Sequence, residues 1–366
     1  MDLCELTPAH IRGIAPYQPG KPISELQREL GLTHVIKLAS NENPLGPSPK
    51  AVAAIQAALP DLALYPDGNG FDLKSALAER FTISRDQIIL GNGSNDVLEL
   101  VARAFLGGKT SAVYAQHAFA VYPLVTQAVG AEGIEVVARD FAHDLEAMIA
   151  AIRPDTRVLF VANPNNPTGT FIPGPILHEA LERVPHHVLI VLDEAYTEYL
   201  LPEQCYDAVS WLESLPNLLI SRTFSKAYGL AGLRVGFGLA RPAIIDLLNR
   251  VRQPFNVSSL ALTAAAAALD DGAFLERTRA VNSAGLAQLT AGFKRLGLPF
   301  IPSYGNFVAV KVGESARIYE SLLRQGIIVR PVAAYQMPLY LRVSVGLEQE
   351  NAAFLAALEA SFSEVA

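Results

Sequence analysis

The sequence predicts an α/β fold: one large domain with a mostly parallel central sheet flanked by helices, and a smaller α+β companion. Two observations support this fold class. The chain has 366 residues, which exceeds one ordinary domain. The apolar runs 158–161, 188–192 and 218–220 are each followed at once by polar residues. Buried parallel strands that end at a ligand-binding edge have this pattern.

The composition favours a large apolar core and argues against a nucleic-acid partner. Apolar residues make up 51% of the chain, and 29 basic against 36 acidic residues give a net charge of −7. Two cysteines, Cys4 and Cys205, form neither a disulfide framework nor a metal set, so we expect no metal site and a reducing compartment. Without a signal peptide or an apolar run of about 18 residues, the chain is expected to be cytoplasmic, with no membrane partner.

Turn-rich segments and one short helix are expected at the start of the chain. Pro16–Gly20 is a turn, and a helix is expected over Ser24–Leu30 with Ser24 as its N-cap. Asn41–Pro49 is rich in Pro and Asn and marks an irregular joint. Tyr65–Gly70 is a further turn.

A glycine-containing turn then leads into a helix. Ile88–Leu90 predicts a short strand, and the turn Gly91–Asp96 precedes a helical pattern over Val97–Leu106. Backbone N–H groups at such a helix start attract anions without a basic side chain. The turn lacks the full dinucleotide fingerprint, which weakens the alternative of a nicotinamide-dependent dehydrogenase.

The segment Ser221–Arg234 is the chemical centre of the sequence. It follows the apolar run 218–220 and places hydroxyls, an ammonium and a guanidinium among small residues, a composition that suits an anion site. Lys226 in such surroundings can be partly desolvated, which lowers its pKa and frees the amine as a nucleophile toward a carbonyl. A solvated loop lysine is the ordinary alternative, since buried lysines are rare.

Two other polar segments are expected at the same sheet edge. Asn163–Gly169 is ordinary turn chemistry when taken alone. Asp193 is more informative, because a carboxylate that follows five apolar strand residues is costly to bury without a cationic partner. Since the carboxyl ends of parallel strands meet at one edge, the three segments are predicted to converge on one crevice.

The C-terminal part alternates helices and short strands and is expected to form the smaller domain. A helix from about Ala264, three strands and a closing helix are expected. The strands are Phe307–Val312, Ile327–Val332 and Leu341–Val345. The predicted division is a large domain over 36–260 and a small domain over 1–35 and 261–366. Arg330 and Arg342 lie in apolar strands and need a partner anion, for which a structural carboxylate is the commoner choice.

The ordered motifs NPNNPTG, DEAY and SRTFSKAYGLAGLR resemble those of the class II, fold type I aminotransferases that use pyridoxal 5'-phosphate, and among them the histidinol-phosphate aminotransferase family. The resemblance runs from about Pro16 to about Gly346. It implies the fold type I architecture and a homodimer with a shared active site. The implied reaction interconverts L-histidinol phosphate and 2-oxoglutarate with imidazole-acetol phosphate and L-glutamate, a step of histidine biosynthesis.

The resemblance also assigns roles around the cofactor. Lys226 would hold pyridoxal phosphate as an aldimine and then act as a general base, and Asp193 would pair with the pyridine nitrogen as the second catalytic residue. Asn166 and Tyr196 would bond the ring oxygen, and Phe119 would stack on the ring where tyrosine is usual. The cofactor phosphate would be bound by Gly93, Ser94, Asn95, Thr223, Ser225 and Arg234, and by Tyr65 from the partner subunit.

The implied substrate-binding residues are Tyr17, Asn166, Arg330 and Arg342. Arg342, in the motif Leu-Arg-Val-Ser-Val-Gly, would meet the acidic group of the substrate with help from Arg330. For histidinol phosphate that group is the phosphate. The resemblance leaves His117 unexplained, because a proline is common at that position.

Several alternatives stay open at this point. Aromatic 2-oxo acids are the closest alternative substrates, because a few pocket residues can retune side-chain preference. Decarboxylation of a phosphorylated amino acid is another activity within the same fold type. A protein that binds the cofactor or a phosphometabolite without catalysis is the alternative of a different class.

Overall fold

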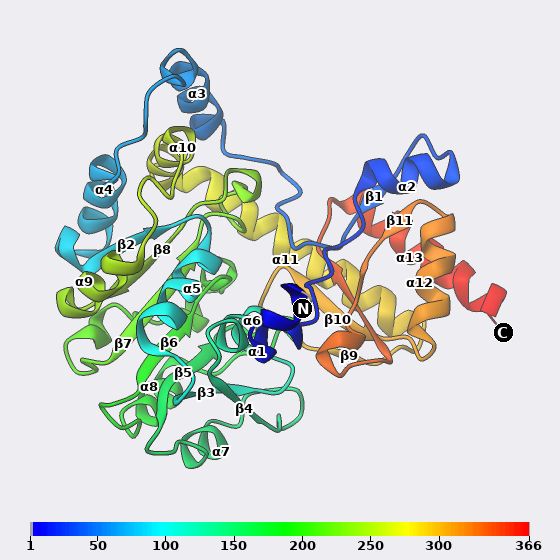
Figure 1. Ribbon diagram of the computed structural model, residues 1–366. Coiled ribbons are helices and arrows are strands. Elements are labelled where there is room, and N and C mark those ends of the chain that lie inside the picture. The colour runs from blue at the N-terminus through cyan, green and yellow to red at the C-terminus, as the bar shows by residue number, and fades with distance from the viewer. Residues whose placement is uncertain (1–2, 366) are drawn as a thin grey trace.

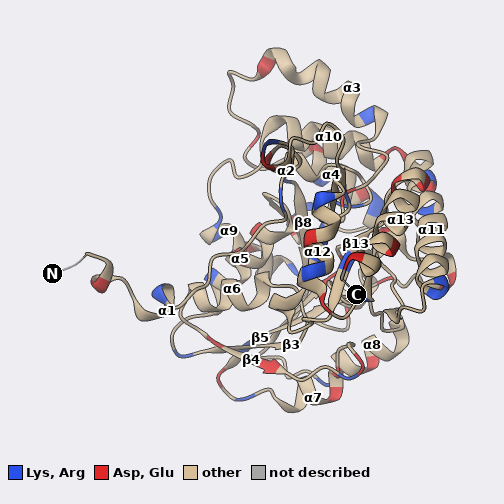
Figure 2. Ribbon diagram, turned by 90° about the vertical axis from the view of Figure 1, so that its right-hand side faces the viewer, with Lys and Arg blue, Asp and Glu red and all other residues tan. Residues whose placement is uncertain are grey.

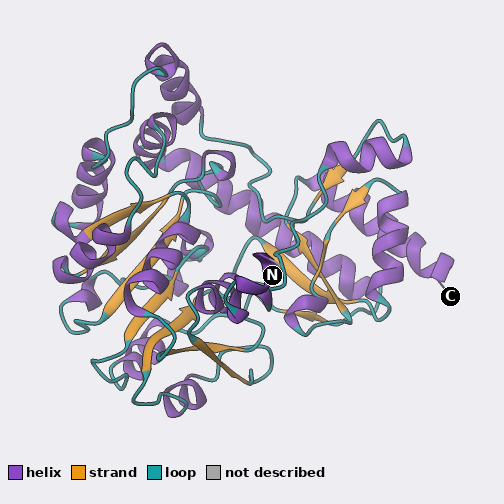
Figure 3. Ribbon diagram, in the orientation of Figure 1, coloured by secondary structure: helices purple, strands orange, loops and turns teal. Residues whose placement is uncertain are grey.

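The computed structural model describes residues 3–365 and places the strands in two main groups (Figures 1 and 3). The larger group is a seven-stranded sheet in the order β2-β8-β7-β6-β5-β3-β4. Its strands are β2 (Ile88–Gly91), β3 (Ser111–Ala115), β4 (Glu132–Val136), β5 (Thr156–Ala162), β6 (Leu189–Asp193), β7 (Leu218–Thr223) and β8 (Gly236–Ala240). Neighbouring strands are parallel except at β8, which runs antiparallel to β2 and β7. The predicted α/β fold with a mostly parallel sheet is confirmed.

The three apolar runs form adjacent central strands. β5, β6 and β7 pair in parallel, and the register places Ala162 opposite Asp193 and Asp193 opposite Ser221. All five residues of β6 are buried, as expected for a strand covered on both faces. The polar segments that follow these strands therefore start at the same edge of the sheet.

Helices surround this sheet (Figure 1). Helix α5 starts at Ser94 and buries the face that carries Val97, Leu98 and Val101, the spacing expected of an amphipathic helix. The helices of this part of the chain are α4 (Phe71–Phe81), α5 (Ser94–Phe105), α6 (Val121–Ala128), α7 (Leu145–Ala150), α8 (Gly174–Leu181), α9 (Pro242–Val251), α10 (Ser259–Leu269) and α3 (Pro49–Ala58), of which α3 stands apart from the sheet. The alanine-rich α10 packs against α3 and α4.

The second group is a four-stranded antiparallel sheet in the order β12-β13-β10-β9. Its strands are β9 (Phe300–Ile301), β10 (Phe307–Lys311), β12 (Arg330–Pro331) and β13 (Tyr340–Ser344). The helices α11 (Gly272–Arg295), α12 (Ser315–Arg324) and α13 (Glu348–Val365) accompany it. Figure 2 shows both acidic and basic residues along α11 and α12, whereas the charged residues of α13 are all acidic. Their core contains Leu289, Phe293, Val308 and Phe354, all fully buried.

The N-terminal segment joins this second group. β1 (Ile36–Lys37) pairs in parallel with β11 (Ile327–Ile328), and α2 (Ile23–Leu30) buries Leu26 against Ile328. Before it come η1 (Leu3–Leu6) and α1 (Ala9–Arg12), and η1 projects from the body in Figure 2. The other short 3-10 helices are η2 (Leu59–Asp61), η3 (Arg85–Gln87), η4 (Thr197–Tyr199), η5 (Pro202–Gln204), η6 (Ser210–Leu212), η7 (Ala231–Leu233) and η8 (Ala333–Tyr335). No helix within residues 3–365 is long and apolar enough to cross a membrane.

Some sequence expectations were wrong in detail. The expected strand Ile327–Val332 is two strands, because β11 pairs with β1 while β12 pairs with β13. Ser24 is not an N-cap, since α2 begins at Ile23 with the extended Pro22 before it and no side-chain cap. β9 and α12 were not anticipated. The domain boundaries at 35/36 and 260/261 stay a prediction.

Candidate active site

One pocket collects residues from both groups of strands. It lies at the carboxyl edge of β5, β6 and β7, and β12 and β13 supply its other side. Every site residue expected from the sequence lines it, except Gly93 and Tyr65. Its volume is about 180 Å³. Lining residues that sequence reasoning did not assign are Gly20, Ala39, Ser40, Asn41, Tyr122, Ala162, Pro164, Ala195 and Tyr335.

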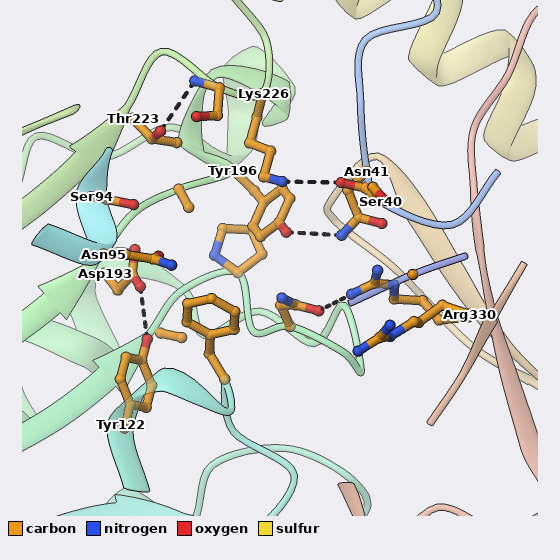
Figure 4. Close-up of a pocket in the computed structure, with 18 of the residues that line it drawn as sticks. Ser40, Asn41, Ser94, Asn95, Tyr122, Asp193, Tyr196, Thr223, Lys226 and Arg330 are labelled. Carbon is orange, nitrogen blue, oxygen red and sulfur yellow. Dashed lines mark hydrogen bonds between the residues drawn. The ribbon is translucent and has the colours of Figure 1, made fainter. Parts of the chain in front are cut away.

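Lys226 follows the end of β7 and extends into this pocket (Figure 4). Its Nζ donates to the carbonyl oxygen of Ser40 at 3.2 Å. Desolvation, together with the weaker effect of the positive charge of Arg342, lowers the pKa of Lys226 to about 8. The turn after it depends on Gly229, which has φ 70° and where a Cβ would lie 2.1 Å from the carbonyl oxygen of Gly46. Lys226 is therefore a desolvated amine with an unusually large neutral fraction near pH 8.

Asp193 is a buried carboxylate with one oxygen left open. It ends β6 and is 4% exposed. The hydroxyl of Tyr122 donates to Oδ2 at 2.9 Å, whereas Oδ1 has no partner in the described part of the chain. Burial raises the pKa of Asp193 to about 6, against the lowering effect of the Tyr122 bond. A buried acceptor without a partner is costly, so Oδ1 suits an N–H donor of a ligand, above all a cationic one.

One end of the pocket is built for an anion. The guanidinium of Arg234 donates from Nη1 to the hydroxyl of Ser225 at 3.3 Å, and Thr223 accepts from the backbone of Ser225 at 3.1 Å. Ser94, the first residue of α5, lies at the same end (Figure 4). Gly93 lies just outside the lining: it has φ 79°, and a Cβ there would lie 2.4 Å from Arg234. A helix N-terminus, two hydroxyls and a guanidinium together bind phosphate-like groups well.

The opposite end carries two arginines. Arg330 of β12 and Arg342 of β13 are direct cross-strand partners. Arg342 is 6% exposed and donates to the carbonyl oxygen of Ala39 at 2.7 Å and to Oδ1 of Asn166 at 2.5 Å. Arg330 donates to the carbonyl oxygen of Gln18 at 2.6 Å, and its guanidinium lies 5.5 Å from the ring centre of Tyr17.

Neither arginine forms a salt bridge with a carboxylate among residues 3–365. Burial lowers the pKa of Arg342, and the neighbouring charge of Arg330 adds to this effect. Two adjacent cations without a protein anion are suited to an anionic ligand. The alternative considered from the sequence, a structural carboxylate as the partner of these arginines, is therefore not found among the described residues. Figure 4 places Arg330 across the pocket from Ser94 and Thr223, with Lys226 between them.

Asn166 and Tyr196 form part of the wall between the two ends. Because Oδ1 of Asn166 accepts from Arg342, its Nδ2 remains as the donor toward a ligand. Tyr196 is 3% exposed, and its hydroxyl accepts from Nδ2 of Asn41 at 2.9 Å. Phe119 lines the pocket and packs edge-on against Tyr122 at 5.8 Å.

The structure explains His117. Its φ is 57°, which a proline ring cannot adopt, and its Nδ1 lies 2.6 Å from the carbonyl oxygen of Tyr335. The contact fixes the backbone of Tyr335, which lines the pocket. No local sequence signal distinguishes Tyr335 or Tyr122 from core residues, since both are buried within short helices.

Tyr65 is outside the pocket of its own chain. It is 84% exposed and stacks on Phe255 with 4.9 Å between ring centres. Its expected contact with the cofactor phosphate across a subunit interface stays a prediction.

Comparisons with known proteins agree with this geometry. The family model described as aminotransferase class I and II matches residues 33–358. A histidinol-phosphate aminotransferase of Methylobacillus flagellatus is 64% identical, covering 98% of this chain and 97% of the relative. Histidinol-phosphate aminotransferase 1 of Thiobacillus denitrificans is 63% identical, covering 97% and 94%. The crystal structure of histidinol-phosphate aminotransferase from Sinorhizobium meliloti in complex with pyridoxal-5'-phosphate superposes with a TM-score of 0.90 at 29% identity, covering 98% of both chains.

Because Lys226 is desolvated, its amine should lose its proton at a lower pH than an ordinary lysine does. In cofactor-free protein, acylation of Lys226 should rise with pH about a midpoint near 8, whereas an ordinary lysine titrates near about 10.4. Asp193→Asn should move the midpoint lower, because the Asp193 carboxylate raises the pKa of Lys226. Peptide mass spectrometry after brief acylation measures this, with the exposed Lys109 as internal reference. A Lys226 profile that matches that of Lys109 would contradict the prediction.

Proposed function

Because the chain belongs to the class I and II aminotransferase family, and within it to the histidinol-phosphate aminotransferases, we propose that it moves the amino group of L-histidinol phosphate to 2-oxoglutarate. The products are imidazole-acetol phosphate and L-glutamate, and the reaction is reversible. The protein is an enzyme of histidine biosynthesis. The observation that carries this assignment is the pair of anion-binding ends with Lys226 between them.

The residues present fit pyridoxal 5'-phosphate as the cofactor. The Arg234 end would hold its phosphate, and the open Oδ1 of Asp193 would accept a hydrogen bond from its protonated ring nitrogen. Nδ2 of Asn166 and the hydroxyl of Tyr196 would donate to its ring oxygen. When bound, this group supplies an electron-withdrawing ring that stabilises negative charge on the α-carbon of the substrate.

Lys226 would have two duties. Its amine, neutral in part near pH 8, would hold the cofactor through the aldehyde carbon. After release by the incoming substrate amine, it would remove the proton from the α-carbon as a general base. The ionised carboxylate of Asp193 would keep the ring nitrogen protonated, which preserves the electron-withdrawing form.

The Arg330 and Arg342 end would bind the acidic group of the substrate. For L-histidinol phosphate this group is the phosphate, and for L-glutamate it is the side-chain carboxylate, so the two substrates would share one anion site. Tyr17 and Tyr335 would enclose the imidazole ring between the anion site and the reacting carbon. Aromatic residues in this wall also suit an aromatic 2-oxo acid, but two arginines that have no carboxylate partner within residues 3–365 favour an anionic substrate.

We further propose that the enzyme is a homodimer whose two subunits share each active site. Exposed apolar residues form a patch at Tyr65: Leu62, Leu64 and Phe71 are near it in the sequence and Phe255 stacks on it, and the five residues are 45% to 84% exposed. The patch borders the phosphate end of the pocket, because Asn92, two residues before Ser94, donates to the carbonyl oxygen of Asn256 at 3.1 Å. Exposed apolar residues of this kind suit an association surface.

A reducing cytoplasm suits the chain, since two cysteines are too few for a disulfide framework. Fractionation of cells that express a tagged chain tests this location, and recovery from a membrane or secreted fraction would contradict it.

Removal of Lys226 should abolish covalent attachment of the cofactor and slow the chemistry. Lys226→Ala should lower kcat by at least about 10²- to 10⁴-fold, because the general base is lost. Borohydride reduction should attach the cofactor to the peptide that contains Lys226 in the parent protein and not in the variant. Lys109→Ala, at an exposed position outside the pocket, is the control. Full turnover together with the parent cofactor absorbance in Lys226→Ala would refute the assignment.

If the arginine end binds the substrate phosphate, removal of Arg330 should weaken the binding of the phosphorylated substrate alone. Arg330→Ala should raise the KM for L-histidinol phosphate about tenfold or more, because a hydrogen bond to a charged oxygen is lost. The KM for unphosphorylated L-histidinol should change little. Steady-state kinetics with both substrates separates these outcomes, and Arg317→Ala on the outer face of α12, with the Arg317 side chain 58% exposed, is the matched control. Equal losses on both substrates would place the phosphate elsewhere.

Sharing of the active site predicts complementation between two inactive chains. Lys226→Ala homodimers should be inactive, and Tyr65→Ala homodimers should lose at least about tenfold of the activity through a lost phosphate contact. In a mixed dimer, one site would combine an intact Lys226 with the partner's intact Tyr65. Differently tagged chains, purified as mixed dimers, should therefore regain about half of the parent activity per dimer. No recovery, or a monomer in sedimentation equilibrium, would contradict the proposal.

A further inference from the structure

Three consecutive residues hold three different functional side chains. The carbonyl oxygen of Ala39 accepts from Arg342 at 2.7 Å, and that of Ser40 accepts from Lys226 at 3.2 Å. The side chain of Asn41 donates to the hydroxyl of Tyr196 at 2.9 Å. Asn41 is 1% exposed and has φ 54°, a backbone conformation that is uncommon outside glycine. A residue in this conformation persists only where the surrounding structure fixes it, and such residues often lie at functional sites.

Ser344 fixes the orientation of the Asn41 amide. The backbone N–H of Asn41, which can only donate, lies 2.8 Å from the Ser344 hydroxyl oxygen. The hydroxyl in turn donates to Oδ1 of Asn41 at 2.9 Å. In the reversed amide orientation, the Ser344 proton would have no acceptor among the described residues, although Ser344 is only 3% exposed. Because an unsatisfied buried donor is costly, the amide places Oδ1 toward Ser344 and Nδ2 toward Tyr196.

This orientation determines where the Tyr196 proton points. Nδ2 of an asparagine is a donor only, so the Tyr196 oxygen must accept from it. The O–H bond of Tyr196 cannot also point toward Nδ2 of Asn41, so the phenol proton remains available to another acceptor. The hydroxyl of Tyr196 has no other hydrogen-bond partner in the described chain, and Tyr196 lines the pocket beside Lys226. Figure 4 shows the side chains of Asn41, Tyr196 and Lys226 facing the same space.

We propose that Asn41, oriented by Ser344, is a positioning residue that keeps the Tyr196 hydroxyl a hydrogen-bond donor toward the ligand in the pocket. This inference rests on the proposed function and deepens it, because the acceptor would be the ring oxygen of the bound cofactor. A donor at that oxygen stabilises its negative charge and lowers the pH at which the loaded protein changes its visible absorbance. Ser344 lies two residues from Arg342 on β13, so the same strand orients Tyr196 and carries the substrate arginine.

Few other charged or titratable groups act on Tyr196. Arg342, Asp193 and Tyr335 act on it electrostatically, and the ammonium of Lys226 lies 5.9 Å from its ring centre. Burial raises the pKa of Tyr196 to about 12, so the phenol keeps its proton in any titration below pH 10. A variant at position 41 therefore changes the direction of the Tyr196 hydrogen bond and not the protonation of the phenol.

The test compares Asn41→Asp and Asn41→Gly, each with Tyr196 and with Tyr196→Phe. Aspartate has the shape of asparagine but its carboxylate accepts, so it should capture the Tyr196 proton. In cofactor-loaded protein, Asn41→Asp should raise the midpoint of the absorbance titration by about one to two pH units, the size expected for a lost hydrogen bond to a charged oxygen. Asn41→Gly tolerates the positive φ and adds no charge, and it should give a smaller shift.

The Tyr196→Phe background separates hydrogen-bond direction from the new negative charge. If the proposal holds, the Asn41→Asp shift should fall by at least about one pH unit when the hydroxyl is absent, as a double-mutant cycle reports. Equal shifts in both backgrounds, or no shift with Tyr196 present, would overturn the proposal. If Asn41→Asp does not fold, Ser344→Ala replaces it: the freed amide should give a shift that disappears with Tyr196→Phe. A parent protein that lacks the cofactor absorbance would instead contradict the proposed function itself.

Discussion

The site depends on the burial of charged groups at one edge of an apolar sheet. The strand β6 contributes five buried residues and ends in the carboxylate of Asp193, while Lys226 and Arg342 enter the same desolvated pocket. Desolvation raises the pKa of the acid to about 6 and lowers that of the amine to about 8. The pKa values of the two groups, which would otherwise lie far apart, are thereby brought closer to each other and to physiological pH.

The same constraint explains why the pocket needs two groups of strands. The seven-stranded sheet supplies the acid, the amine and the Arg234 end, whereas β12 and β13 supply the two arginines, which have no carboxylate partner in the described part of the chain. Residues 39–41 connect them, because they contact Arg342 of β13 on one side and Lys226 and Tyr196 on the other. Ligand binding would therefore depend on how the two groups of strands are held together.

The sequence predicted the parts of this arrangement that local pattern encodes. Asp193 and Lys226 were found because each follows an apolar run, and the parallel pairing of β5, β6 and β7 brings those ends together. Tyr122 and Tyr335 were missed because a buried tyrosine in a short helix has no local mark of function, and only tertiary packing aims it at the pocket. The two strands within Ile327–Val332 were missed for a similar reason, since their partners lie far apart in the chain. The role proposed for Tyr65 would require a second copy of the chain, which a sequence pattern does not show.

The most direct test of the whole account is a half-reaction followed by absorbance. L-histidinol phosphate is added to cofactor-loaded protein without an amino acceptor, and L-phenylalanine and L-glutamate are added in parallel samples. Two anion-binding ends around Lys226 predict rapid conversion of the visible cofactor band by L-histidinol phosphate, at much lower concentration than by L-phenylalanine. A preference for L-phenylalanine would contradict the assignment of the arginine end to a phosphate, and the absence of any cofactor band would contradict the role of Lys226.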